Sequence, residues 1–124
     1  MTIKILVVDD NQVSRELIRE VLNSPDQVVL EAENGEEALE MILAERPDIV
    51  LLDIQIPAFD GFEVLRRLRS DPRFDNLPVI ALSAYAMQRD YEKALKLGFD
   101  DYITKPIDIS ALRVRIEEIL HTND

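Results

Sequence analysis

The sequence predicts an α/β fold in which five parallel strands form one sheet, with five helices packed on its two faces. Short apolar runs alternate strictly with longer amphipathic stretches along all 124 residues, and this alternation is typical of a parallel sheet with helical crossovers. The apolar runs contain few polar residues, as expected for strands that are buried on both faces. Right-handed crossovers leave few topologies, and five units of this length favour an open, doubly wound sheet.

The five predicted strands are short, apolar and rich in β-branched residues. The first, Ile-Lys-Ile-Leu-Val-Val-Asp, lies almost at the start of the sequence and is largely apolar until its final aspartate. The third, Asp-Ile-Val-Leu-Leu-Asp, is apolar between two aspartates. Runs of this length between polar or turn-forming residues favour buried strands. In chain order we expect strands at residues 3–9, 27–32, 48–53, 78–83 and 100–104.

The five predicted helices are indicated by apolar residues that recur every three or four positions. Their ends carry the usual signals: Pro47 closes the second, Asp60 can cap the third and Gly98 stops the fourth. The first is expected to present one apolar stripe, formed by Val13, Leu17, Val21 and Leu22. In chain order we expect helices at residues 14–23, 34–47, 60–72, 87–98 and 108–121.

Composition limits the domain organisation and the partners. A chain of 124 residues that is 47% hydrophobic can bury one sizeable core, so we expect a single domain over residues 1–124 and no output domain. Acidic residues outnumber basic ones by 25 to 14, and we therefore expect no direct binding to nucleic acid or to anionic membranes. There is no cysteine, no apolar run of about 20 residues and no basic leader. We expect a cytoplasmic protein.

Polar side chains stand at the carboxyl ends of four predicted strands. Asp9 and Asp10 end the first strand or follow it, Asp53 ends the third, Ser83 ends the fourth and Lys105 follows the fifth. Each has an ordinary interpretation when it is taken alone, as a helix cap or as a solvated charge. Ligands in such sheets bind beyond the carboxyl ends of the strands, so we expect these five side chains to converge on one site.

The chemistry of this set points to phosphoryl transfer. Clustered carboxylates repel one another, which raises their pKa values unless a cation lies among them, and oxygen ligands without a complete protein cage suit Mg²⁺. A carboxylate nucleophile, a hard dication, a hydroxyl and an ammonium are the groups that phosphoryl transfer uses. An isolated buried carboxylate is costly. We therefore interpret Asp53, at the end of an otherwise apolar run, as the nucleophile.

The motifs around these residues resemble those of a known family. They are Val-Val-Asp-Asp-Asn at 7–11, Leu-Leu-Asp-Ile-Gln-Ile-Pro-Ala-Phe-Asp-Gly at 51–61, Leu-Ser-Ala at 82–84 and Asp-Tyr-Ile-Thr-Lys-Pro at 101–106. In this combination the sequence resembles, over nearly its whole length, a receiver domain of the two-component response regulators, of the single-domain, chemotaxis-regulator-like type. The resemblance implies a flavodoxin-like fold with the strand order 2-1-3-4-5.

The resemblance also implies how the phosphoryl group is held. Asp53 would accept it from a histidine kinase or a phosphotransfer protein, and Ser83 and Lys105 would bind its oxygens. Ala84 is small and would leave room for them, and the bond before Pro106 is expected to be cis. Serine at position 83 stands where threonine is more frequent in the family, which keeps the hydroxyl and loses a methyl group.

The metal and the switch follow from the same resemblance. Asp10 and Asp53 would bind Mg²⁺, or Mn²⁺ in its place, together with the backbone carbonyl of Gln55, while Asp9 would act largely through water. Tyr102 would be the switch aromatic, swinging inward when the serine moves to the phosphate. A downstream protein would then bind a face formed by the fourth helix, the fifth strand and the fifth helix.

Two other classes of protein share parts of this pattern. A small aspartyl-phosphate phosphatase of haloacid-dehalogenase type needs a second aspartate two residues after its nucleophile, where this sequence has Gln55. A flavin-binding electron carrier needs a hydroxyl- and glycine-rich loop after its first strand, where two aspartates stand. We predict a phosphorylation-dependent switch, with the phosphatase as the alternative. The only activity we expect is slow, Mg²⁺-dependent self-phosphorylation and self-dephosphorylation.

Overall fold

The structure is a computed structural model that describes residues 2–57, 60–85 and 87–122. Ala58 and Phe59 of the motif at 51–61 lie outside the described residues. Five parallel strands form one sheet in the order β2-β1-β3-β4-β5, which confirms the predicted order. The strands are β1 (Ile3–Val8), β2 (Gln27–Ala32), β3 (Ile49–Asp53), β4 (Val79–Ser83) and β5 (Asp101–Thr104).

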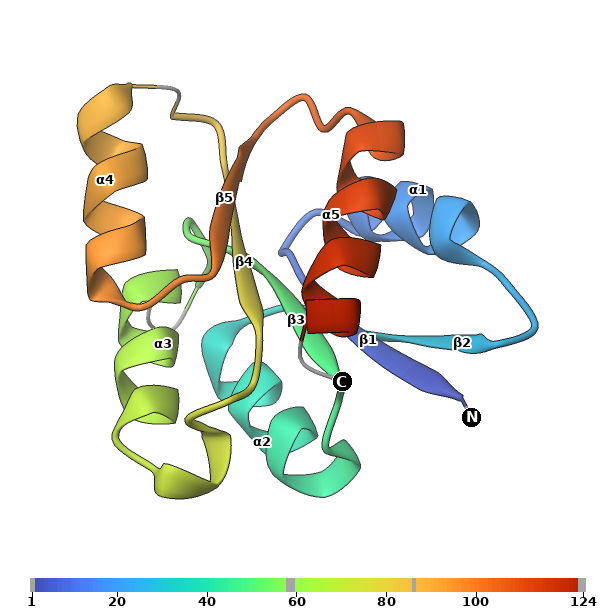
Figure 1. The fold of residues 1–124 in the computed structure, drawn as a ribbon, viewed down its shortest axis with the longest axis horizontal. Helices are drawn as coiled ribbons and strands as arrows, with labels where there is room; N and C mark the ends of the chain where they lie inside the picture. The colour runs from blue at the N-terminus through green and yellow to red at the C-terminus, as the bar shows by residue number, and fades with distance from the viewer. Residues whose placement is uncertain (1, 58–59, 86, 123–124) are drawn as a thin grey trace.

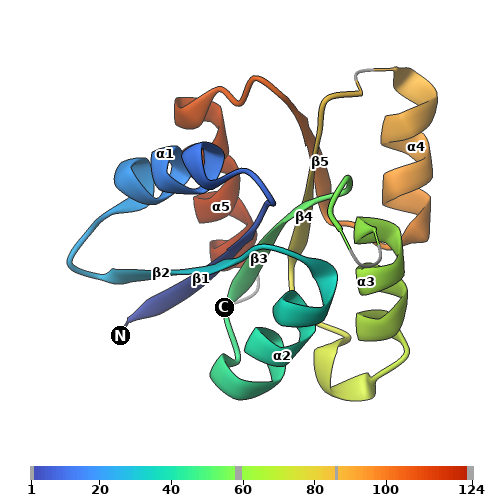
Figure 2. The ribbon, with the colours of Figure 1, turned by 180° about the vertical axis from the view of Figure 1, so that it is seen from behind.

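Helices cover both faces of the sheet. Figures 1 and 2 show α1 and α5 on one face and α2, α3 and α4 on the other. The helices are α1 (Gln12–Leu22), α2 (Gly35–Glu45), α3 (Gly61–Arg69), α4 (Gln88–Leu97) and α5 (Ile109–Thr122), with a short 3₁₀ helix η1 (Pro72–Phe74). In the described part of the chain, no helix combines the length and the apolar character needed to cross a membrane.

The core consists of two apolar layers, one on each side of the sheet. Successive strand residues point to opposite faces, so Leu6 and Leu52 pack towards α2, α3 and α4, while Ile5 and Leu51 pack towards α1 and α5. All four of these side chains are fully buried. Burial on both faces explains why β1 and β3 read as continuous apolar runs rather than as alternating ones.

The third helix is shorter than predicted. It ends at Arg69, and the chain then forms η1, which Asp71 caps by accepting a hydrogen bond from the Arg73 amide. Pro72 has no amide hydrogen and cannot continue a helix, but it fits the first position of a new one. The predicted cap at the other end of α3 is confirmed, because the Asp60 carboxylate accepts a hydrogen bond of 3.0 Å from the Glu63 amide.

The predicted apolar stripe of α1 is wrong in part, because only Leu22 of its four residues is buried. Val13 and Leu17 are 73% and 52% exposed, whereas Arg15, Ile18 and Leu22 are buried. The buried set has the spacing i, i+3, i+7 and therefore lies along one side of the helix. Helical periodicity alone fits either side of the helix, so it does not identify the side that faces the sheet. An arginine therefore occupies the buried side of α1, where apolar periodicity predicts no charge.

Candidate functional site

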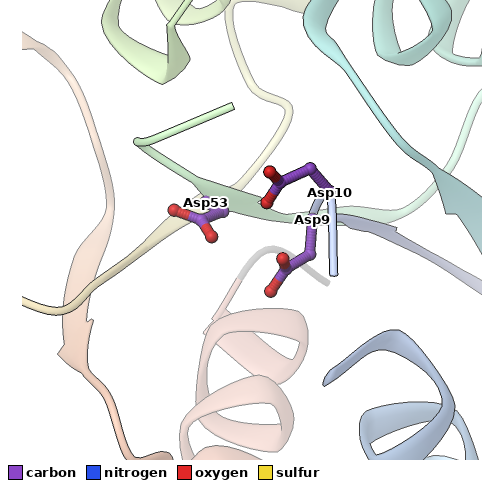
Figure 3. A group of neighbouring side chains, drawn as sticks. All are labelled: Asp9, Asp10 and Asp53. Atoms are coloured by element: carbon purple, nitrogen blue, oxygen red, sulfur yellow. The ribbon is translucent and has the colours of Figure 1, made fainter. Parts of the chain in front are cut away.

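The carboxyl edge of the sheet brings the predicted polar residues together. Asp9 follows β1, Asp53 ends β3, Ser83 ends β4 and Lys105 follows β5. Figure 3 shows Asp9, Asp10 and Asp53 around one space, and one carboxylate oxygen from each lies within 4.8 Å of those of the others. Asp9, Asp53 and Ser83 are buried, whereas Asp10 is exposed. The site is therefore an acidic pocket that opens to solvent on the side of Asp10.

Lys105 joins two of the carboxylates across the sheet. Its ammonium nitrogen lies 2.6 Å from Asp53 Oδ2 and 3.0 Å from Asp9 Oδ2. Burial disfavours the charged lysine, but the hydrogen bonds to Asp53 and Asp9 outweigh burial, and the pKa of Lys105 is raised. The lysine therefore stays protonated, and it offsets part of the repulsion between two buried anions.

Asp53 is held by its own backbone as well as by Lys105. Its Oδ1 accepts a hydrogen bond of 2.9 Å from the Gln55 amide. Burial is the strongest influence on Asp53 and raises the pKa of its carboxyl, against the hydrogen bonds from Lys105 and Gln55, which lower it. A carboxylate that is desolvated but held in place by donors on both oxygens suits a nucleophile, because few solvent molecules must be displaced before it reacts.

Gly61, at the start of α3, lets that helix approach the end of β3. A Cβ atom at this position would lie 2.7 Å from the Ile54 Cα and 3.0 Å from the Asp53 carbonyl oxygen. The Gly61 amide also donates a hydrogen bond of 2.8 Å to the Ile54 carbonyl. The glycine in the motif at 51–61 therefore has a steric role directly behind Asp53.

Ser83 and Tyr102 are connected through the β4–α4 loop. The Ser83 hydroxyl accepts a hydrogen bond of 3.0 Å from the Tyr85 amide, and the Tyr102 hydroxyl donates one of 2.7 Å to the Tyr85 carbonyl. The Tyr102 ring is only 8% exposed and packs edge-to-face on Tyr91. The predicted switch tyrosine thus already points inward in this structure, and movement of the Ser83 hydroxyl would disturb the loop that holds it.

The remaining predicted positions lie at the rim of the pocket. Ala84 and Pro106 are exposed, and the bond between Lys105 and Pro106 is cis, as predicted. The Lys105 amide donates a hydrogen bond of 2.7 Å to the Ser83 carbonyl, which ties the two loops together. That Ala84 leaves room for phosphoryl oxygens stays a prediction.

Sequence reasoning missed Arg15. Its Nη1 donates a hydrogen bond of 2.6 Å to the Asp9 carbonyl, so a buried guanidinium from α1 contacts the backbone of the acidic pocket. The available signal was the spacing i, i+3 and i+7 of Arg15, Ile18 and Leu22, which places the arginine on the same side of the helix as the two apolar residues. Apolar periodicity alone treats a charged residue as evidence against burial, so it does not indicate that Arg15 is buried.

The donor set fits a hard divalent cation. All three clustered side chains supply carboxylate oxygens, and the exposure of Asp10 leaves room for water, which Mg²⁺ retains when it binds proteins. The described residues contain no cysteine at all, and no histidine belongs to the cluster. The cluster therefore lacks the sulfur and imidazole ligands that softer metals prefer.

Comparison with known proteins gives consistent findings. Residues 5–117 match the family model described as the response regulator receiver domain. The chain is 36% identical over 105 residues to the polar-differentiation response regulator DivK of Brucella anthropi, and this match covers 85% of each chain. It is 41% identical over 120 residues to the response regulator MprA of Mycobacterium ulcerans, covering 97% of this chain and 51% of MprA. The chain thus spans about half the length of MprA.

Solved structures agree in fold. The receiver domain of the Francisella response regulator 1452 superimposes with a TM-score of 0.92 at 32% sequence identity, and the match covers 99% of this chain and 100% of that one.

Proposed function

Because the chain belongs to the response regulator receiver domain family of two-component signalling, we propose that it is a phosphorylation-dependent switch with Asp53 as its acceptor. The single observation that carries this proposal is the bridge from Lys105 to Asp53 and Asp9, at an edge where three carboxylates gather. A nucleophile, its cationic partner and a cation site are then present together. The proposed donor is a phosphohistidine on a histidine kinase or a phosphotransfer protein.

In the transfer, an Asp53 oxygen attacks phosphorus. The new O–P bond forms as the N–P bond to the donor histidine breaks, and the histidine leaves with the bonding electron pair. Lys105, which already lies 2.6 Å from Asp53 Oδ2, would follow the charge from the carboxylate to the phosphoryl oxygens. The buried Ser83 hydroxyl would exchange its bond with the Tyr85 amide for one to the same group.

Asp10 and Asp53 would hold the metal ion directly, with the Gln55 backbone carbonyl as a third protein ligand and Asp9 acting through water. Mg²⁺ is the proposed ion, with Mn²⁺ as the alternative. When bound, it supplies positive charge to the phosphoryl oxygens. The donor chemistry and the opening to solvent beside Asp10 support this assignment.

We assign the output to the face formed by α4, β5 and α5. Exposed apolar side chains gather on and just before α4, namely Tyr85, Met87, Tyr91, Leu95 and Leu97. Tyr102 packs against one of them, Tyr91, and is joined through the Tyr85 carbonyl to the loop that carries Ser83. A phosphoryl group on Asp53 would thus shift the loop between two arrangements and change the face that a downstream protein binds.

The acidic surface also bears on where the protein acts and on what it binds. We propose that residues 1–124 act as one receiver domain in the cytoplasm, through protein contacts rather than by direct binding to DNA. The excess of acidic residues supports this, because such a surface repels phosphate backbones. The phosphatase alternative gains no support from the site: Gln55, where that class needs an acid, offers an amide instead.

The test is phosphorylation by acetyl phosphate in the presence of Mg²⁺. The wild type should gain one acid-stable, base-labile phosphoryl group, and Asp53→Asn should gain none. Asp60→Asn is a matched control, because Asp60 is an exposed helix cap on the same segment of chain. A label that maps to a residue other than Asp53 would contradict the proposal.

A further inference from the structure

Arg15 is a buried cation beside the acidic pocket. Its side chain is 7% exposed, and it is the only basic side chain that is buried among the residues whose burial is described. Removing a guanidinium from water is costly unless its donors find good partners. The contacts that compensate for this burial therefore indicate what the residue does.

Three groups from different parts of the fold hold the guanidinium. Its Nη1 donates to the Asp9 carbonyl at 2.6 Å, its Nε to Glu31 Oε1 at 3.2 Å, and its Nη2 to Glu33 Oε1 at 3.5 Å. The exposed Arg19 contacts the other carboxylate oxygen of Glu31, with its Nη1 2.9 Å from Oε2. A planar fork fixed on several sides cannot turn freely, so the Asp9 carbonyl is held in one direction.

Asp9 is fixed at its other polar atoms as well. Its amide donates to the Ala32 carbonyl at 3.1 Å, its Oδ1 accepts from the Asn11 amide at 2.9 Å, and its Oδ2 accepts from Lys105 at 3.0 Å. The carbonyl that Arg15 holds belongs to the peptide that links Asp9 to Asp10. Its orientation therefore sets the direction in which Asp10 leaves the strand.

The position of the Asp10 carboxylate depends on the backbone more than the positions of the Asp9 and Asp53 carboxylates do. Its side chain is exposed, and within the described residues no side-chain hydrogen bond holds its carboxylate. We propose that Arg15 is a positioning residue for the acidic pocket: by holding the Asp9–Asp10 peptide it keeps the Asp10 carboxylate beside Asp9 and Asp53. This role rests on the proposed function, because the pocket is there assigned to a divalent cation.

Geometry and charge make opposite predictions for the loss of Arg15. A positively charged guanidinium near the pocket repels Mg²⁺, so removal of its charge alone would tighten Mg²⁺ binding. Loss of positioning would weaken binding, as is usual when a residue that orients a metal ligand is replaced. The sign of the change in Mg²⁺ affinity therefore separates the two effects. If Arg15 only bridged α1 and β2, the charge effect alone would remain, and loss of the guanidinium would tighten Mg²⁺ binding.

The experiment is a Mg²⁺ titration followed by backbone amide NMR at a temperature where every variant is folded. We expect Arg15→Met to weaken Mg²⁺ binding about tenfold, at the lower end of the effects seen for residues that orient metal ligands. Arg15→Lys keeps the charge but loses the planar fork, and it should also weaken binding several-fold. Arg19→Met is the matched control. Arg19 also contacts Glu31, but its side chain is 61% exposed and its guanidinium bonds Glu31 and not Asp9. This variant should bind Mg²⁺ as the wild type does, or slightly more tightly.

Each outcome decides the matter. Equal or tighter binding by Arg15→Met would overturn the positioning role, as would wild-type binding by Arg15→Lys. If the methionine variant does not fold, the lysine variant gives the answer. Phosphorylation of the wild type by acetyl phosphate is measured separately. If the Arg15 variants bind Mg²⁺ more weakly than the wild type, but the wild type accepts no phosphoryl group, the proposed function is refuted and the positioning role of Arg15 stands.

Discussion

Replacing Lys105 by methionine tests the electrostatic balance of the acidic pocket. The substitution removes the ammonium that lies 2.6 Å from Asp53 and 3.0 Å from Asp9, and it leaves two buried carboxylates facing each other. Breaking a fully buried pair costs about 3–5 kcal/mol. The Lys105 side chain is 27% exposed, so water compensates part of this loss. We expect the free energy of unfolding to fall by about 2 kcal/mol at pH 8 without Mg²⁺, which lowers the melting temperature by roughly 6–8 °C.

The pH dependence of this loss follows from the pKa of Asp53. Burial raises that pKa in the folded protein above its ordinary value, although Lys105 and Gln55 lower it. For an acid with a raised folded pKa, stability is full below the unfolded pKa and declines as the pH rises through the folded one. Without Lys105 the pKa of Asp53 should rise further. The destabilisation by Lys105→Met should therefore be larger at pH 8 than at pH 5.

The assay is urea denaturation in a chelating buffer, arranged as a double-mutant cycle with Asp53→Asn. Asp53→Asn alone should raise the stability at pH 8, because it removes a desolvated charge. In that background Lys105→Met should cost less than in the wild type. Lys96→Met, at an exposed position of α4, is the matched control and should change the stability little. An equal cost of Lys105→Met in both backgrounds would refute the bridge as a source of stability.

Three further predictions concern the metal, the packing and the switch. Millimolar Mg²⁺ should raise the melting temperature of the wild type by mass action, and Asp10→Ala should remove most of that effect; identical melting with and without Mg²⁺ would contradict a metal site. Gly61→Ala should destabilise the protein by about 1–3 kcal/mol in urea denaturation, because its Cβ would lie 2.7 Å from the Ile54 Cα. With beryllofluoride as a phosphoryl mimic, the NMR signals of the Tyr102 ring should shift in the wild type, and Ser83→Ala should largely suppress the shift; unchanged signals at full occupancy would contradict the switch.

The sheet and the position of the pocket were predictable because both depend on short-range patterns. An apolar run such as that of β3 has few alternatives to a strand buried on both faces. Once parallel strands are inferred, their carboxyl ends must lie along one edge. That rule places Asp9, Asp53, Ser83 and Lys105 at the same edge of the sheet. The strand order was not obtained in this way; it came from the family resemblance and is confirmed by the structure.

The contacts of α1 were not predictable by the same route. Periodicity identifies a helix, but it does not say which of two adjacent stripes faces the sheet, and Val13 and Leu17 proved to be exposed. The side of the helix that carries Arg15 is buried because Asp9, Glu31 and Glu33 offer partners for its donors. These partners come from other elements of the fold, so the burial of Arg15 follows from tertiary structure and not from local sequence.

The distribution of charge in the pocket suggests how a modest chemical change is detected. Three carboxylates and one ammonium leave the pocket with a formal charge of about minus two, which a bound divalent cation would balance. The proposed phosphorylation of Asp53 would exchange a singly charged carboxylate for a group that carries nearly two charges and three acceptor oxygens. The net charge would thus change by only about one unit, whereas the demand for hydrogen-bond donors would rise sharply. Ser83 is the buried donor whose hydroxyl can answer that demand, and it is tied through Tyr85 to Tyr102. On the proposed function, the signal would therefore be a redistribution of hydrogen bonds rather than a long-range electrostatic field.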